Sequence, residues 1–184
     1  MHKTIPHHLI EGVRCNDRQA QLELYRKYSE GMFRVANRFV NNVQDAEDLM
    51  QEAFISAFQK IEQYSGEVAF GAWLKKIVIN KCLDHLKSQK RQLELVEEHI
   101  PEISEEPTDW EVEEQVSVDE VKKAAFSLPE KYKRVILLYL FEGYSHDEIA
   151  QILDISVIAS RSQLLRGKQK LKRLLKHQLN GSGY

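Results

Sequence analysis

The chain has 184 residues, of which 42% are hydrophobic and 29% charged, a composition typical of one or two small globular domains. No apolar run is long enough to cross a bilayer, and the first residues lack the apolar core of a signal peptide, so we expect a cytoplasmic protein without membrane insertion. The two cysteines, Cys15 and Cys82, are solitary and far apart, which is typical of reduced thiols.

The net charge of −2 hides an uneven distribution along the chain. Residues 92–120 contain 12 acidic side chains and no lysine or arginine. The remainder therefore has 16 acidic residues (28 minus 12) against 26 basic ones, a balance of +10. This pattern predicts two basic lobes joined by an acidic stretch, and basic lobes favour a polyanionic partner.

In the first half of the chain, apolar residues recur at helical spacing. They predict a helix over 16–42, with a possible break at Gly31, and a second helix over 45–64. Asp45 is expected to be the N-cap of that second helix, because its carboxylate can accept from the first backbone N–H groups. A third long helix is predicted over 70–91.

Residues 92–118 contain two prolines and no sustained apolar period, so they predict a flexible acidic linker. Helical patterns resume near Val118 and continue over 117–128 and 129–143, where Gly143 is a suitable C-cap. We therefore predict an all-α protein with two small helical domains. The predicted boundaries are a first domain over 1–91, the acidic linker over 92–118 and a second domain over 119–184.

The stretch from Ser145 to Leu175 has the plan of a helix-turn-helix. Ser145 and Glu148 predict a capping box, a tight turn follows at Asp154, and a second, basic helix begins after it. That helix is expected to turn its leucines inward and its opposite face towards a DNA major groove. The residues predicted at the DNA are Ser156, Ile158, Arg161, Ser162, Gln163, Leu165, Arg166, Lys168 and Arg173. The same pattern also fits a solvated helix that closes a bundle, so these residues alone leave DNA binding open.

Two earlier helices carry polar rows that admit more than one interpretation. On the helix over 45–64, the row opposite the apolar stripe is polar except for Ile55, and it is either a solvated face or a docking surface. On the helix over 70–91, Phe70 and Trp73 favour a core role over a stacking role. Asn80 and Asp84 continue that apolar stripe, so we expect them on the buried side. Their polar groups would then need hydrogen-bond partners, which the edges of unpaired bases could supply.

Histidines and cysteines also suggest a metal site, in the groups His7, His8 and Cys15, and Cys82 with His85. Neither group has a complete four-ligand pattern, so no metal and no cofactor is predicted. Carboxylates are numerous, but none is paired with a base and a nucleophile, and the sequence has no glycine-rich phosphate loop. We therefore predict a protein that is not an enzyme.

Three segments together resemble the extracytoplasmic-function (ECF) sigma factors, the compact two-domain initiation subunits of bacterial RNA polymerase. They are "DAEDLMQEAF" over 45–54, "FGAWLKKIVINKCLDHLK" over 70–87, and "LPEKYKRVILLYLFEGYSHDEIAQILDIS" followed by "SRSQLLRGKQKL" over 128–171. Their order and spacing are similar to the family's polymerase-binding, −10 and −35 segments, from about Gln19 to Leu175. The resemblance implies core RNA polymerase, duplex −35 DNA and single-stranded −10 DNA as partners, and allows for an anti-sigma factor.

The resemblance also implies roles for individual residues. It assigns the DNA-contacting residues of the helix-turn-helix, given above, to the −35 element. The residues implied in polymerase binding are Asp45, Asp48, Leu49, Gln51, Glu52, Ile55 and Gln59. The residues implied at the −10 element are Phe70, Trp73, Lys76, Asn80, Lys81, Asp84, Lys87 and Arg91, with the loop "SGEVAF" over 65–70 holding a flipped base.

The chain departs from the family pattern within the helix-turn-helix. Asp154 stands where the family usually has glycine, although aspartate tolerates the left-handed backbone that such a turn requires. Ile158-Ala159 stands in place of Gly-Thr, and Ser160 and Gln163 replace the commoner valine and arginine. These changes bear on which −35 sequence is bound.

A stand-alone helix-turn-helix regulator, binding duplex DNA as a dimer, is the alternative hypothesis. It explains the second half of the chain equally well, but it assigns no role to the segment over 45–54 or to the helix that carries Asn80.

Overall fold

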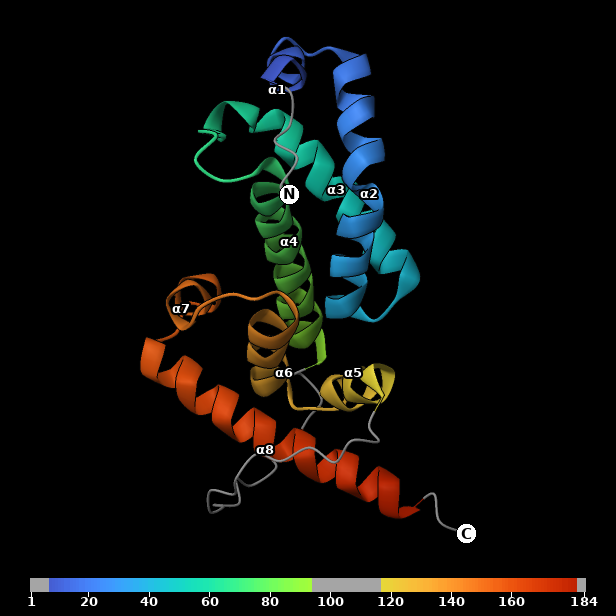
Figure 1. The fold of residues 1–184 in the computed structure, drawn as a ribbon, viewed down its shortest axis with the longest axis vertical. Helices are drawn as coiled ribbons and strands as arrows, with labels where there is room; N and C mark the ends of the chain where they lie inside the picture. Colours follow the sequence, from blue (N-terminus) through green and yellow to red (C-terminus); the bar gives the residue numbers. More distant parts are fainter. Residues whose placement is uncertain (1–6, 94–116, 182–184) are drawn as a thin grey trace. The chain divides into compact units, whose positions relative to one another are not determined.

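The computed structural model describes residues 7–93 and 117–181, and these residues form helices, turns and loops without a β-strand (Figure 1). The predicted all-α fold is therefore confirmed. The chain divides into two compact units, residues 1–98 and residues 99–184. The predicted linker over 92–118 lies largely outside the described residues.

The first unit consists of α1 (His7–Arg14), α2 (Arg18–Val40), α3 (Val43–Gln59), the short 3-10 helix η1 (Ile61–Gln63) and α4 (Phe70–Leu93). The three long helices α2, α3 and α4 each pack against the other two, and α1 packs on α2 and η1. Their shared core includes Leu24, Phe39, Phe54, Leu74 and Ile79, all of which are buried. Burial of this apolar surface is the main source of the unit's stability.

The boundaries of the first helices differ in part from those predicted. Gly31 does not break α2, which continues through it to Val40. Helix α3 begins earlier than expected because Asn42, in an extended conformation, caps it: the Asn42 side chain accepts from the backbone N–H groups of Gln44 and Asp45. The prediction of Asp45 as the N-cap is therefore wrong. The predicted helix over 45–64 also ends early, at Gln59, and η1 follows it.

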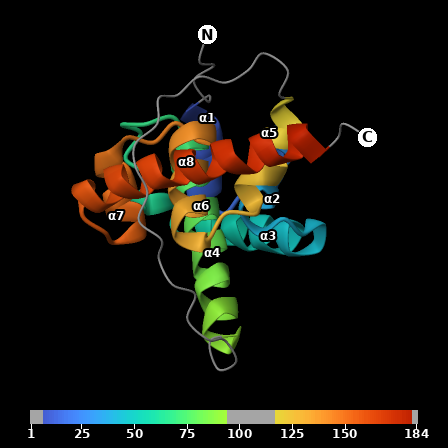
Figure 2. The same ribbon diagram turned by 90° about the horizontal axis from the view of Figure 1, so that it is seen from below.

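The second unit consists of α5 (Val118–Phe126), α6 (Glu130–Ile136), a π-helical turn η2 (Leu137–Phe141), α7 (His146–Leu153) and α8 (Val157–Gly181). Helix α8 runs past α7, α6 and α5 and packs on all three (Figure 2). Gly167 allows α8 to lie close to α6, because a Cβ atom at this position would stand 3.0 Å from Cγ1 of Ile136. The C-cap of η2 is Glu142, one residue before the predicted Gly143, and Gly143 follows it in a left-handed conformation with φ of 76°.

The helix-turn-helix is formed by α7 and α8, and its local signals are confirmed. Ser145 and Glu148 form the predicted capping box at the start of α7. Asp154 adopts the left-handed conformation, with φ of 54°, and ends α7. The Ser156 hydroxyl then accepts from the backbone N–H of Ala159 at 3.0 Å, so it caps the first turn of α8.

Candidate nucleic-acid and polymerase interfaces

Helix α8 presents its predicted DNA-contacting residues on the outside of the second unit. Its opposite face packs inward through Ser160, Leu164, Leu171 and Leu175. Ile158 is 76% exposed, which is unusual for a large apolar side chain in the first turn of a helix. The remaining predicted residues on this segment are also exposed, except for Gln163 and Lys168, which are half-buried: Ser156, Arg161, Ser162, Leu165, Arg166 and Arg173.

A buried polar contact fixes α8 against α7. Ser160 is fully buried, and its Oγ lies 2.9 Å from Nδ1 of His146, the first residue of α7. The His146 ring in turn stacks on Tyr139 of η2, with ring centroids 4.9 Å apart and planes 27° apart. A buried hydroxyl needs a hydrogen-bond partner, and a serine in line with the buried leucines of α8 was a signal for one, although the sequence did not identify His146.

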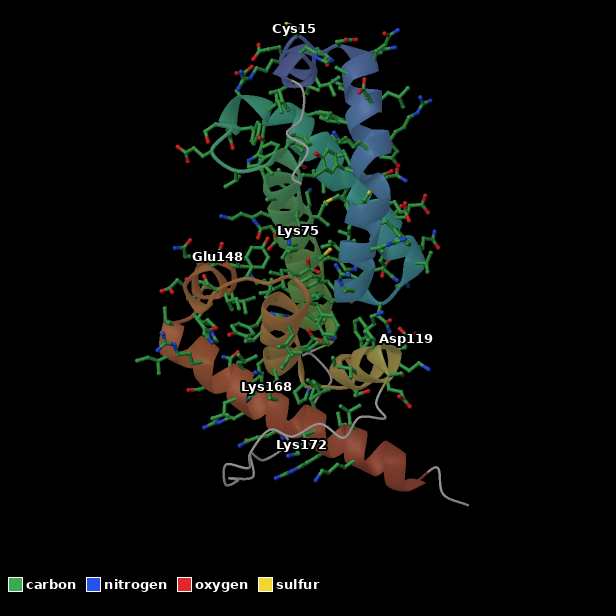
Figure 3. The ribbon with its side chains drawn as sticks, in the orientation of Figure 1. Cys15, Lys75, Asp119, Glu148, Lys168 and Lys172 are labelled. Carbon is green, nitrogen blue, oxygen red and sulfur yellow. The ribbon has the colours of Figure 1, made fainter. Side chains whose placement is uncertain are left out.

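Lys168 differs from the other basic residues predicted on the DNA side of α8. Its Nζ lies 5.7 Å from the centroid of the Tyr139 ring, a cation–π contact within the unit. Figure 3 shows Lys168 and Lys172 on successive turns of α8. Arg161 and Arg166 are exposed. The two arginines therefore have more freedom than Lys168 to meet an external phosphate or base.

Helix α3 carries the residues predicted to bind polymerase, and most of them lie on its outer face. Asp48, Gln51, Glu52 and Gln59 are exposed, and Asp45 is half-buried. Ile55 is 58% exposed in the middle of this polar row. Leu49 is the exception, because only 7% of its surface is exposed and it therefore packs mainly within the unit.

The outer face of α3 and one side of α4 meet across a hollow of about 640 Å³. An ion pair bridges it, with Lys81 Nζ 3.2 Å from Glu52 Oε2. Beside it, His85 Nε2 lies 3.7 Å from Asp45 Oδ2. The structure thus brings residues predicted for polymerase binding next to residues predicted for −10 binding. The hollow is lined by Leu49, Glu52, Ser56, Lys60, Ile77, Asn80, Lys81, Asp84, His85 and Ser88.

The residues of α4 that were predicted at the −10 element differ in burial. Phe70 is buried, as its core role predicted, whereas Trp73 is half-buried. Asn80 and Asp84 are exposed, so the prediction that they lie on the buried side is wrong. The buried stripe advances by four residues at a time, through Leu74, Val78 and Cys82, with Ile79 and Leu83 beside it.

The other basic residues predicted on α4 lie at the surface. Lys76 and Lys87 are exposed, and Lys87 Nζ lies 4.0 Å from Asp84 Oδ1. Lys81 is the half-buried partner of Glu52 described above. Arg91 belongs to α4, but its side chain lies outside the described part of the structure.

The loop before α4 is held by Tyr64, which the sequence had not singled out. The Tyr64 hydroxyl donates to the backbone oxygen of Val68 at 2.8 Å. The Tyr64 ring packs against Phe70 and Trp73, with centroid separations of 5.6 and 5.3 Å. Burial raises the pKa of the Tyr64 hydroxyl above its ordinary value.

The cysteines of the two suggested metal groups differ in exposure. Cys15 is exposed, whereas Cys82 is fully buried and burial raises its pKa to about 12. Within the described ranges, no three histidine, cysteine, aspartate or glutamate side chains form a metal-binding group. Over the same residues, no helix is both long and apolar enough to span a membrane.

Comparison with known proteins identifies both units. Residues 24–92 match the family model of sigma-70 region 2, and residues 119–171 match that of sigma-70 region 4. The RNA polymerase sigma-H factor of Pseudomonas aeruginosa is 29% identical over 178 residues, covering 91% of this chain and 92% of the relative. The ECF RNA polymerase sigma-E factor of Haemophilus influenzae is 30% identical over 178 residues, covering 89% of this chain and 92% of the relative.

Solved structures agree at the level of the fold. CnrH, in complex with the cytosolic domain of CnrY, matches with a TM-score of 0.57 and 23% identity over 92% of this chain and 96% of that one. The sigma factor RpoE, in complex with the anti-sigma factor NepR from Bartonella quintana, matches with a TM-score of 0.59 and 21% identity over 84% of this chain and 95% of that one.

The two matched regions together cover more than half of the chain, in the order that the resemblance predicted, and the 30% identity to the Haemophilus protein extends over nearly all of it. The chain therefore belongs to the ECF sigma factors of the sigma-70 family and directs transcription initiation.

Proposed function

We propose that this sigma factor divides its work among three surfaces. The outer face of α3 docks on core RNA polymerase. Helix α4 and the loop before it bind the opened −10 strand, and the outer face of α8 enters the major groove at −35. The observation that carries the proposal is the exposed Ile55 in the polar row of α3. It gives α3 a surface for a protein partner, whereas the alternative of a stand-alone helix-turn-helix regulator assigns no role to the segment over 45–54.

The α3 surface has the composition of a protein interface. An apolar centre at Ile55 is flanked by the exposed carboxylates of Asp48 and Glu52. Such a centre supplies affinity when it is desolvated, whereas the surrounding charges set orientation and the rate of encounter. Glu52 is partly engaged by Lys81, so docking there would also affect α4.

The α4 surface suits single-stranded DNA. Asn80 and Asp84 are exposed and carry hydrogen-bonding groups that match the edges of unpaired bases. Lys76 and Lys87 are exposed on the same helix and add positive charge for the backbone. Extruding a base costs a few kcal/mol, so the surface needs specific contacts to offset that cost.

The α8 surface suits duplex DNA. Ser162 and Arg166 are exposed and can reach base edges, and Ile158 can pack on a thymine methyl group. Arg161 and Arg173 are exposed and are suited to phosphates.

The remaining proposals concern chemistry, location and regulation. The chain is expected to contribute recognition and strand opening, while the polymerase supplies the chemistry of RNA synthesis. Its place of work is then the cytoplasm, with the polymerase. An anti-sigma factor is included among the proposed partners, since RpoE, which shares this fold, has been solved with one.

Polymerase docking is tested by Ile55→Glu, with Val43→Glu as the matched control. Both side chains are exposed apolar residues of α3, at 58% and 64%, but Val43 lies outside the proposed row, in the first turn. Ile55→Glu should weaken binding to core polymerase by about tenfold or more, since it places a charge at the centre of the interface. Val43→Glu should bind normally, and both variants should keep their melting temperature, as surface substitutions usually do. If the two variants bind core polymerase equally in gel filtration, the chain does not dock through the row of α3 that contains Ile55.

A further inference from the structure

Residues 65–69 form the loop between η1 and α4 (Figure 1). All five of these residues are exposed. The loop contains Gly66 in a left-handed conformation, with φ of 81°, and an exposed apolar side chain at Val68. An exposed loop of this kind normally samples many conformations, and a ligand that needs one of them has to offset the entropy of ordering it.

Tyr64 restricts this loop from within. Its hydroxyl donates to the Val68 backbone oxygen at 2.8 Å, which closes the chain on itself across four residues. The ring that carries the hydroxyl is fixed by an edge contact with Phe70, which is buried, and by a tilted contact with Trp73. The position of the hydroxyl is therefore set by the core of the first unit.

Helix α1 restrains the start of the same loop. Arg14, its last residue, donates from Nη2 to the Tyr64 backbone oxygen at 3.2 Å. The same guanidinium is held by Glu11 at 2.7 Å through Nη1, and it lies 3.7 Å from Glu62 through Nε. Because α1 packs on α2 and η1, Arg14 ties the loop to the body of the unit.

We propose that Tyr64 is a positioning residue for the −10 strand: its hydroxyl holds the loop over 65–69 in the conformation that receives an extruded base, and Arg14 holds Tyr64. This inference rests on the proposed −10 function of the loop. Its physical content is preorganisation, since the cost of ordering the loop is met during folding rather than during binding.

The test uses the full chain assembled with core polymerase, and a labelled single-stranded oligonucleotide that spans the −10 element of a promoter that this holoenzyme transcribes. A matched set of oligonucleotides carries one abasic site at each position in turn. The wild-type holoenzyme should lose about tenfold in affinity at the position of the extruded base, because base contacts of this kind contribute on that scale.

Tyr64→Phe removes the hydroxyl and keeps the ring. It should bind the intact oligonucleotide about two- to tenfold more weakly, the range for one lost hydrogen bond. It should bind the oligonucleotide that lacks the extruded base as the wild type does. Arg14→Gln should likewise reduce the difference in affinity between the intact oligonucleotide and the one that lacks the extruded base. Tyr25→Phe is the control, because it also removes a tyrosine hydroxyl from the first unit, but from a ring that packs on Phe54 of α3, and it should leave the discrimination unchanged.

The possible failures are distinguishable. A wild-type holoenzyme that binds all abasic oligonucleotides equally would overturn the proposed role of the loop, and this inference with it. Discrimination that Tyr64→Phe retains in full would overturn the inference alone. An equal loss by Tyr64→Phe on intact and abasic oligonucleotides would also overturn it, because that result indicates a general structural role.

Discussion

Short polar side chains mark the helix ends of this chain, and their roles depend on one or two neighbouring residues. The capping box of Ser145 and Glu148 and the left-handed turn at Asp154 were predictable because each acts within a few residues. Asp45 was the only N-cap predicted for α3, although Asn42, three residues earlier, also has a suitable side chain. The extended backbone at Asn42 decides between them, and only the structure supplies it.

Contacts between residues distant in the sequence could not be predicted in the same way. The partner of Ser160 is His146, which lies 14 residues earlier on another helix. The tie between Arg14 and the Tyr64 carbonyl spans 50 residues. Each depends on how helices pack, so the residue types alone indicate at most that a partner is needed.

We expect glycine-to-alanine substitutions at two helical positions to have opposite effects on stability. Gly31 in α2 is exposed, and a Cβ atom added there would have nothing within 4 Å, so Gly31→Ala should stabilise the first unit by about 0.5–1 kcal/mol through helix propensity. At Gly167 in α8 the new methyl would press on buried Ile136 and Tyr132, at 3.0 and 3.3 Å from their nearest atoms. Overpacking costs about 1–3 kcal/mol, so Gly167→Ala should be destabilising on balance. Urea unfolding followed by circular dichroism measures both, and a stabilising Gly167→Ala would show that α6 and α8 can separate at little cost.

At the scale of helices, the existence of the long elements followed from apolar periodicity, but the face of α4 did not. Alternating steps of three and four residues from Phe70, through Trp73 and Ile77, lead to Asn80 and Asp84, which are exposed. The buried stripe instead follows steps of four from Leu74. Both patterns fit an α-helix over a short stretch, and they diverge over the 24 residues of α4. The π-helical turn over Leu137–Phe141 had no sequence signal that we recognise.

Helix α8 is predicted to divide base reading from backbone contact between two exposed arginines. In the holoenzyme, Arg166→Ala should cost about 1–3 kcal/mol and relax the preference at one −35 position, because a guanidinium can bind a guanine edge through two hydrogen bonds. Arg161→Ala should weaken all promoters alike and lower the salt dependence by about one unit. Arg26→Ala, at an exposed arginine of α2 outside the three surfaces, is the control.

Affinity measurements on a randomised −35 library separate the two effects. If Arg166→Ala also weakens every sequence equally, Arg166 contacts phosphate. The base preference would then have to come from Ser162, Gln163 or Ile158, the other outward residues near the start of α8.

At the scale of the whole molecule, two units with separate cores carry the matched sigma-70 regions 2 and 4. Their order and their helical character were accessible from the sequence, because each is encoded by local periodicity and by three motifs in succession. The uneven charge also fits this plan, since the acids concentrated over 92–120 leave an excess of basic side chains on either side of that stretch: 14 basic against 11 acidic residues over 1–91, and 12 against 5 over 121–184. The residue-level assignments within the three surfaces remain predictions.

The central claim, that the chain recognises promoters as a subunit of the polymerase through these surfaces, is tested most directly by a footprint on promoter DNA. With core polymerase and the wild-type chain together, we predict protection at both −35 and −10, with unpaired −10 bases reactive to permanganate. With the chain alone, or with core polymerase and Ile55→Glu, we predict neither −10 protection nor strand opening. An equally strong −35 footprint from the chain alone, unchanged by core polymerase and without opening at −10, would contradict the account.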